Sequence, residues 1–295
     1  MTSAQVNGIT IEYDEHGGKD AEPLLLVMGL GTQMIAWPLP FVERLVDKGF
    51  RVVRFDNRDT GLSSEIDAPV PTKRQVIAST LSYRFAKASY LLSDMADDAA
   101  ALLDHLEIKA ANVVGASMGG MIVQSLAIGH PERVLSLTSI MSNTGDRKNG
   151  KISLEVMRKA PRLLSRDPDK ALDNAVKMGR LVSGPHFDEA AARALIAEAA
   201  ARHDDVAGTA RQMMAIAASP DRTADLHKLT MPTLVIHGLV DRLVKPSGGI
   251  ATAKAVPGSR LVMYPDMGHD LPQQRWDDVI EEIADNSRRS RSATV

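Results

Sequence analysis

Short apolar runs alternate with longer segments of helical periodicity along most of this chain. Solid apolar runs bounded by turn residues are typical of strands that are buried on both faces of a parallel sheet. The pattern predicts strands at Ile9–Tyr13, Leu24–Met28, Arg51–Phe55, Asn112–Gly115, Val134–Ile140, Thr233–His237 and Arg260–Tyr264. It predicts helices between them at Phe41–Lys48, Leu91–Leu106 and Trp276–Asp285. This alternation indicates repeated β-α-β units and a doubly wound α/β sheet.

One long stretch, from residue 144 to residue 226, has no strand pattern. It contains helix-like segments separated by prolines, at Ile152–Lys159, Asp169–Leu181, Asp188–Arg202 and Val206–Ala217. Roughly eighty residues is too long for an ordinary connection between two strands of a sheet. We therefore expect a helical cap at 144–226, inserted between the two parts of a core at 1–143 and 227–295. The alternative is a peripheral bundle away from any site.

Composition narrows the classes of function. The chain has 35 basic and 37 acidic residues, so no strong field favours nucleic acid or an anionic membrane as a partner. It has no cysteine, which excludes disulfides, thiolate nucleophiles and cysteine-ligated metals. The first residues lack the pattern of a signal peptide, and no apolar run approaches the roughly eighteen residues of a membrane helix. A cytoplasmic protein is expected, whose oligomeric state the sequence leaves open.

Residues 111–121 read ANVVGASMGGM and join an apolar strand to a helical pattern through a glycine-flanked serine. A serine at the apex of such a turn takes a strained backbone conformation that presents its Oγ at the top of a sheet. Gly115 and Gly119 let strand and helix approach closely, and Met118 follows with a backbone N–H at the helix N-terminus. Ser117 is therefore the candidate nucleophile, although a Gly-x-Ser-x-Gly run also occurs in ordinary glycine-rich loops.

Two titratable residues follow later strands of the predicted sheet. Asp241 comes just after the strand Thr233–His237, and His269 comes shortly after the strand Arg260–Tyr264. Open α/β sheets place their sites at the carboxyl ends of their strands. A serine becomes a nucleophile when a base takes its proton and a third group orients that base. The order Ser117, Asp241, His269 thus predicts a catalytic triad.

Other residues of the same types have competing interpretations. Asp270 adjoins His269 and Asp146 follows the strand Val134–Ile140, so either could replace Asp241 as the orienting acid. No pair of histidines has His-Glu-x-x-His or a comparable metal-ligand spacing, so no metal and no cofactor are expected. Structural roles are expected for three residues, which are His237 at a strand end and Asp56 and Arg58 in a turn.

The chain resembles the serine hydrolases of the α/β-hydrolase fold over nearly its whole length. The shared landmarks are the Ser117 turn, Leu25–Gly31 (LLVMGLG), Phe55–Ser63 (FDNRDTGLS), Pro232–Asp241 (PTLVIHGLVD) and Gly268-His269. It is most similar to small capped carboxylesterases, including methylesterases of aclacinomycin-type polyketides. The resemblance implies a mostly parallel eight-stranded sheet flanked by helices, with a helical cap between strands 6 and 7 and the triad Ser117, His269 and Asp241.

The resemblance also implies an oxyanion hole made of backbone N–H groups, from Leu30 and Met118. Many relatives have histidine where this chain has Met28, which leaves open whether Gly29 or Leu30 donates. Methionines adapt to varied shapes and are suited to an apolar acyl or alcohol pocket. The candidate substrate-binding residues are Gly29, Met34, Trp37, Met213 and Met214.

These features predict an enzyme that hydrolyses a small-molecule carboxylic ester through an acyl-enzyme intermediate. Three alternatives use the same fold. The Ser-Met-Gly-Gly turn also resembles that of carbon–carbon bond hydrolases, and an acyltransferase or perhydrolase would resolve the acyl-enzyme with an acceptor other than water. A ligand receptor would use the pocket for binding without turnover. The natural substrate and its acyl and alcohol sizes are not determined by the sequence.

Overall fold

The computed structural model describes residues 2–72, 74–75, 79, 86–163, 168–203 and 206–292. Within these residues, eight strands form one sheet in the order β1-β2-β4-β3-β5-β6-β7-β8. Strands β1 and β2 pair antiparallel, as do β2 and β4, and all the other neighbours are parallel. The strands are β1 (Thr2–Val6), β2 (Ile9–His16), β3 (Glu22–Val27), β4 (Phe50–Phe55), β5 (Ala111–Ala116), β6 (Val134–Ile140), β7 (Thr233–Gly238) and β8 (Arg260–Tyr264).

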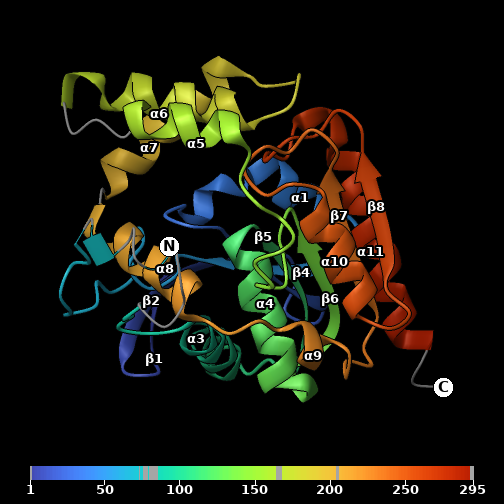
Figure 1. Cartoon of the computed structure of the whole chain (residues 1–295). Coiled ribbons are helices and arrows are strands. Elements are labelled where there is room, and N and C mark those ends of the chain that lie inside the picture. Colours follow the sequence, from blue (N-terminus) through green and yellow to red (C-terminus); the bar gives the residue numbers. More distant parts are fainter. Residues whose placement is uncertain are drawn as a thin grey trace.

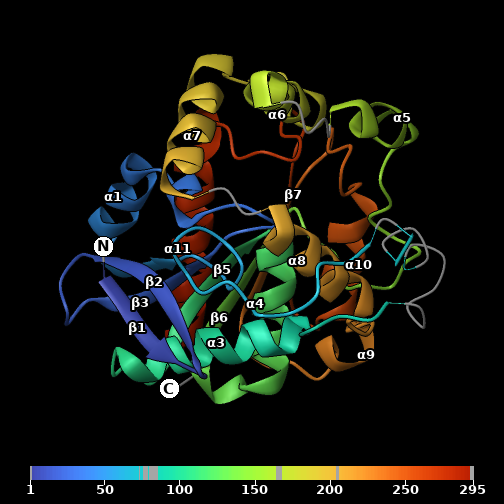
Figure 2. The ribbon, with the colours of Figure 1, turned by 90° about the vertical axis from the view of Figure 1, so that its left-hand side faces the viewer.

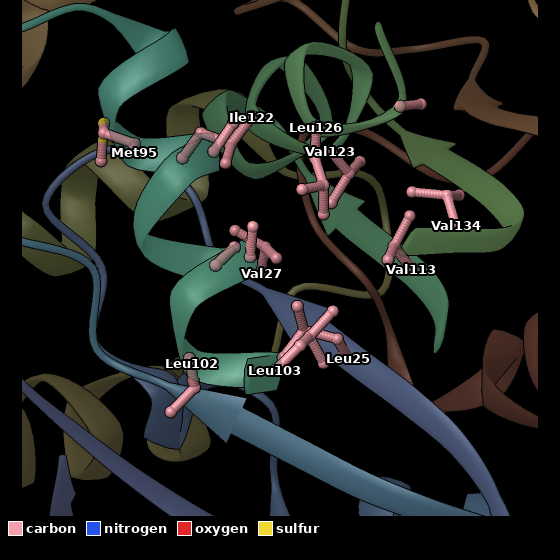
Figure 3. Close-up of a cluster of buried hydrophobic side chains, with 14 of the residues drawn as sticks. Leu25, Val27, Met95, Leu102, Leu103, Val113, Ile122, Val123, Leu126 and Val134 are labelled. Carbon is pink, nitrogen blue, oxygen red and sulfur yellow. The ribbon is translucent and has the colours of Figure 1, made fainter. Parts of the chain in front are cut away.

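Helices cover both faces of the sheet and make two apolar cores (Figure 1). Alternate residues of β3 face opposite sides, with Leu25 and Val27 in one core and Leu24 and Leu26 in the other. The first core contains the apolar residues of α3 (Leu92–His105) and α4 (Met118–Gly129), as Figure 3 shows. The second contains those of α1 (Leu39–Asp47) and α11 (Trp276–Ser292). The solid apolar strands of the sequence are therefore explained by burial on both faces.

Five helices lie between β6 and β7 in the described part of the chain and are called the inserted helices below. They are α5 (Leu154–Leu163), α6 (Pro168–Val182), α7 (Glu189–Arg202), α8 (Val206–Ala218) and α9 (Thr223–Leu226). Helices α5, α6 and α7 gather beyond one end of the sheet in both Figure 1 and Figure 2. Helix α10 (Ser247–Ala255) follows β7 and contacts both β7 and β8. No helix of the described residues combines the length and the apolar character that a bilayer-spanning segment needs.

The predicted strands agree with the observed ones to within three residues at each end, but β1 was missed. Its sequence TSAQV has only two apolar residues, Ala4 and Val6, and both are buried while the other three side chains are exposed. Helix α11 also continues well beyond the predicted end at Asp285. The apolar pattern stops there, and Arg288 in the added turns forms ion pairs with Glu281 and Asp285.

Candidate active site

Ser117 occupies a sharp turn between β5 and α4. Its backbone has φ 56° and ψ −118°, which is a strained conformation for a residue with a side chain. The Ser117 N–H donates to the carbonyl of Ile140 at 2.9 Å, which ties the turn to the end of β6. A β-carbon at Gly115 would overlap the backbone of Gly119, and one at Gly119 would overlap the carbonyl of Val27. The glycines that flank the serine are therefore required by close backbone packing.

The structure brings Ser117, His269 and Asp241 together. The Nε2 atom of His269 lies 2.9 Å from Oγ of Ser117, and its Nδ1 atom lies 2.8 Å from Oδ2 of Asp241. The Asp241 side chain is fully buried, and the His269 side chain is 9% exposed. Asp241 lies in the loop after β7, and His269 lies in the loop after β8. Three loops at the carboxyl ends of parallel strands thus build one chain of hydrogen bonds.

Asp241 is held in the ionised form. Burial alone would raise the pKa of its carboxyl group, but hydrogen bonds from His237 and His269 outweigh burial and lower that pKa below its ordinary value. The Oδ1 atom also accepts hydrogen bonds from the backbone N–H groups of Leu243 at 2.8 Å and Val244 at 2.9 Å. The carboxylate is therefore fixed by its own loop on one oxygen and faces His269 with the other.

His237 is buried beside the same carboxylate. Its Nε2 atom lies 2.8 Å from the carbonyl oxygen of Val244 and 3.4 Å from Oδ2 of Asp241. Its Nδ1 atom has no hydrogen-bond partner among the described residues. The burial of His237 agrees with the structural role predicted for it, but only one of its ring nitrogens has a partner among the described residues. Gly249 lies close to the other nitrogen, since a β-carbon there would be 2.6 Å from Nδ1.

Neither rival acid takes the place of Asp241. The Oδ1 atom of Asp270 accepts hydrogen bonds from the N–H groups of Gly184 at 3.2 Å and Gly268 at 2.9 Å, and burial raises the pKa of its carboxyl group. Asp146 accepts hydrogen bonds from residues 148 and 149 of its own loop. Of these three acids, Asp241 alone is hydrogen-bonded to the His269 ring among the described contacts.

A tight turn at Gly29–Thr32 lies against the serine. A β-carbon at Gly29 would sit 3.1 Å from the Cβ of Ser117 and 3.2 Å from the carbonyl oxygen of Ala116, so a larger residue there would crowd the serine. The N–H of Thr32 donates to the carbonyl of Gly29 at 3.2 Å, and the N–H of Gly31 donates to Oε1 of Gln212 at 2.8 Å. Two N–H groups of the turn are therefore occupied. Met118 opens α4, so its N–H has no acceptor within the helix.

Three predicted substrate contacts are core residues in the structure. Met34 has no exposed surface, and Trp37 and Met214 are each 1% exposed. Trp37 stacks on Phe41, with ring centroids 5.6 Å apart, inside the core formed with α1 and α11. Because these side chains fill the interior, they offer no surface to a bound molecule. Of the five predicted contacts, Gly29 lies beside Ser117, and Met213 is 41% exposed.

Asp56 belongs to a buried turn, as the sequence predicted, but the turn also contacts the inserted helices. The Asp56 carboxylate accepts hydrogen bonds from the N–H groups of Met34 and Leu62, and it forms an ion pair with Arg202 of α7 at 2.9 Å. Asp59 forms a second buried ion pair, with Arg211 of α8 at 2.7 Å. Arg202 is 146 residues from Asp56, and Arg211 is 152 residues from Asp59. Sequence reasoning missed both arginines, and also Gln212, which is bound to Thr60 of the same turn, because no local pattern marks them.

Other histidines have partners of their own. The ion pairs are His130 with Asp97, His186 with Asp266 and His203 with Glu65. In the parts of the chain that the structure describes, no three His, Asp or Glu side chains lie close enough to hold a metal ion.

Comparisons with known proteins agree with this architecture. Residues 22–272 match the family described as alpha/beta hydrolase fold. Rhodomycin D methylesterase from Streptomyces peucetius is 32% identical, over 97% of each chain. The enol-lactonase from Burkholderia xenovorans has a TM-score of 0.74 at 27% identity, over 97% of this chain and 99% of its own. The meta-cleavage product hydrolase from Pseudomonas fluorescens has a TM-score of 0.76 over 98% of each chain at 18% identity, a likeness of fold alone. The chain therefore belongs to the alpha/beta hydrolase fold family.

Proposed function

We propose that this protein hydrolyses a carboxylic ester through a covalent acyl-enzyme on Ser117. The observation that carries the proposal is the continuous hydrogen-bond chain from Ser117 Oγ through His269 to Asp241. Membership of a hydrolase family and the similarity to a methylesterase support an ester as the substrate class. Serine at this turn supports acyl transfer, because carbonyl attack by a serine forms an ester with the enzyme.

The first half of the reaction forms the acyl-enzyme. His269 Nε2 accepts the proton of Ser117 Oγ while that oxygen attacks the ester carbonyl, and the imidazolium is stabilised by the ionised Asp241. The carbonyl oxygen becomes an oxyanion, which the backbone N–H groups of Leu30 and Met118 bind. His269 then returns the proton to the alcohol oxygen as the carbon–oxygen bond breaks, so the alcohol leaves neutral.

The second half releases the acid. Water replaces the alcohol, loses one proton to His269 and attacks the acyl carbonyl through the same oxyanion site. Collapse of the tetrahedral intermediate breaks the bond to Ser117 Oγ, which recovers its proton from His269. The free enzyme and a carboxylic acid result. A small alcohol such as methanol is the proposed leaving group, because the relative that is similar over 97% of both chains is named as a methylesterase.

The inserted helices are proposed to act as a cap at residues 144–226, between core segments 1–143 and 227–295. Buried ion pairs join α7 and α8 to the turn that carries Asp56 and Asp59, so the helices are attached next to the site. Such helices would decide which esters reach Ser117 while leaving the bond-breaking steps to the core.

Turnover of a graded panel of methyl and aryl esters by Ser117→Ala tests the proposal. We expect a folded protein whose kcat is lower by several orders of magnitude, and which no longer reacts with a fluorophosphonate. Ser125→Ala is the matched control, since Ser125 lies on α4, directly after the Ser117 turn, and its hydroxyl donates to the carbonyl of Met121. Labelling that persists in Ser117→Ala would exclude Ser117 as the nucleophile.

The same assay separates the alternatives. Product that depends on an added alcohol or on peroxide would indicate an acyltransferase or a perhydrolase. Cleavage of a diketone in preference to every ester would indicate a carbon–carbon bond hydrolase. A single stalled turnover would indicate a receptor.

A further inference from the structure

A glutamine of the inserted helix α8 binds the turn that lies against Ser117. The Oε1 atom of Gln212 accepts a hydrogen bond from Gly31 N at 2.8 Å. Its Nε2 atom donates to the carbonyl of Arg58 and to Oγ1 of Thr60, each at 2.7 Å. Gln212 is completely buried. Because the Gly31 N–H only donates and the Arg58 carbonyl only accepts, these partners fix the orientation of the amide.

Gly31 directly follows Leu30, whose N–H is the proposed oxyanion donor. The turn Gly29–Thr32 is short and is closed by the hydrogen bond from the Thr32 N–H to the Gly29 carbonyl. A shift of the Gly31 N–H therefore also changes the direction in which the Leu30 N–H points. Gly31 has φ +60°, and a β-carbon there would lie 2.6 Å from Oγ1 of Thr209, also on α8. Helix α8 therefore both packs on this turn and accepts a hydrogen bond from it.

Helix α7 holds the residues that follow the turn. The Nε2 atom of Gln33 donates to the carbonyls of Ala199 and His203, each at 2.8 Å, and Arg202 donates to its Oε1 atom. Two inserted helices thus bind this segment, α8 at Gly31 within the turn and α7 at Gln33 directly after it. Its position depends on contacts that do not belong to the sheet.

We propose that Gln212 is a positioning residue that aligns the Leu30 N–H with the oxyanion. The inference rests on the proposed function, because it takes the reaction to pass through an oxyanion. Hydrogen bonds that strengthen in the transition state act on kcat, and their strength depends steeply on geometry. The inserted helices then contribute to the chemical step as well as to the choice of substrate.

Gln212→Met tests this role, because methionine has a similar volume but offers no acceptor to Gly31. We expect kcat to fall about 10- to 100-fold, as for a misplaced catalytic group, with a much smaller change in KM. The affinity for an alkyl boronic acid, which forms a tetrahedral adduct on serine, should fall by a similar factor. Gln212→Glu keeps an acceptor for the Gly31 N–H, and a buried glutamic acid that stays protonated still donates to the Arg58 carbonyl, so this variant should recover most of kcat.

Arg211→Lys is the matched control. Arg211 neighbours Gln212 on α8 and is also buried, but its ion pair is with Asp59 and not with the turn Gly29–Thr32. If the two substitutions only weakened the packing of α8 on the core, both Gln212→Met and Arg211→Lys would lower the melting temperature. We expect Arg211→Lys to lower the melting temperature while kcat and boronic-acid affinity stay near the wild-type values.

Two results would overturn the inference. One is a folded Gln212→Met variant with wild-type kcat and boronic-acid affinity, and the other is an equal loss of kcat in Arg211→Lys. If Gln212→Met does not fold, Gln212→Asn shortens the side chain by one methylene and withdraws the acceptor from the Gly31 N–H, and wild-type kcat and boronic-acid affinity in that variant overturn the inference instead. Ser117→Ala separates the two proposals, since activity that survives it contradicts the function itself. If Ser117→Ala is inactive, wild-type behaviour of the Gln212 variants contradicts only the positioning role.

Discussion

The Nε2 atom of His237 lies 3.4 Å from Oδ2 of Asp241, the same oxygen that contacts Nδ1 of His269 at 2.8 Å. His237 also lies 2.8 Å from the carbonyl of Val244, and since a carbonyl only accepts, Nε2 carries the hydrogen. The proposed triad acid is therefore flanked by two imidazoles, one facing Ser117 and one buried behind it. The buried ring joins the start and the end of the loop that carries Asp241.

His237→Phe should weaken the fold and lower activity moderately. The buried carbonyl of Val244 would be left without its donor, which costs about 1–3 kcal/mol of unfolding free energy. The fall in kcat should be smaller than for Asp241→Asn, because the loop N–H groups and His269 still hold the carboxylate. Urea unfolding and steady-state kinetics measure the two effects. An activity loss as large as that of Asp241→Asn would mean that His237 does more than restrain the loop.

Asp241→Asn and Asp270→Asn should have opposite outcomes. The amide at 241 favours the wrong tautomer of His269, so kcat should fall by about two to four orders of magnitude. At 270, a single oxygen accepts both backbone N–H groups, and an amide oxygen can do the same. Because the pKa of Asp270 is raised in the folded protein, ionisation of this carboxyl group lowers stability as pH rises through its pKa. Asp270→Asn should therefore retain activity and be at least as stable as the wild type at pH 7. A reversal would move the orienting role to Asp270.

Tryptophan at two neighbouring positions of α8 should separate packing from substrate choice. Met214 is 1% exposed, so Met214→Trp overfills the interior and should lower the unfolding free energy by about 1–3 kcal/mol. Met213 is 41% exposed, so Met213→Trp should fold normally and shift the preferred ester size while acetate turnover stays close to wild type. An unchanged ester profile for Met213→Trp would place this residue outside the pocket.

Acid should remove the contribution of Asp266 to stability. A hydrogen bond from Arg275 and a further one from His186 lower the pKa of Asp266 to about 2. This pKa lies below the value of about 3.9 in the unfolded chain, so ionised Asp266 stabilises the fold above about pH 3.9. The stabilisation is lost as pH falls toward 2. Asp266→Asn should therefore lower the melting temperature at pH 7, and the difference should vanish near pH 2.

Thermal unfolding between pH 2 and pH 7 measures this effect. Asp277→Asn is the control, since Asp277 is an exposed carboxylate paired with Arg44 and such pairs contribute little. A melting-temperature difference for Asp266→Asn that persists at pH 2 would contradict an electrostatic origin.

Local patterns predicted most of the sheet and the three residues of the proposed triad. Burial on both faces makes β3 and β5 solid apolar runs, and the Ser117 turn requires glycines that are visible in the sequence. Asp241 and His269 were found because each follows a strand, and parallel strands end at one edge of the sheet. Strand β1 was missed because its two apolar residues make too short a pattern.

Contacts between distant segments were decided by tertiary structure alone. The sequence by itself determined the α/β class, the helical segment between β6 and β7, and the order of serine, aspartate and histidine. It did not determine that Trp37 and Met214 would be buried, because the burial of one side chain depends on how whole helices and strands pack together. Nor did it indicate Gln212, whose three partners lie 152 to 181 residues away. A hydrogen bond between such segments leaves no periodicity in either one, so only the folded chain reveals it.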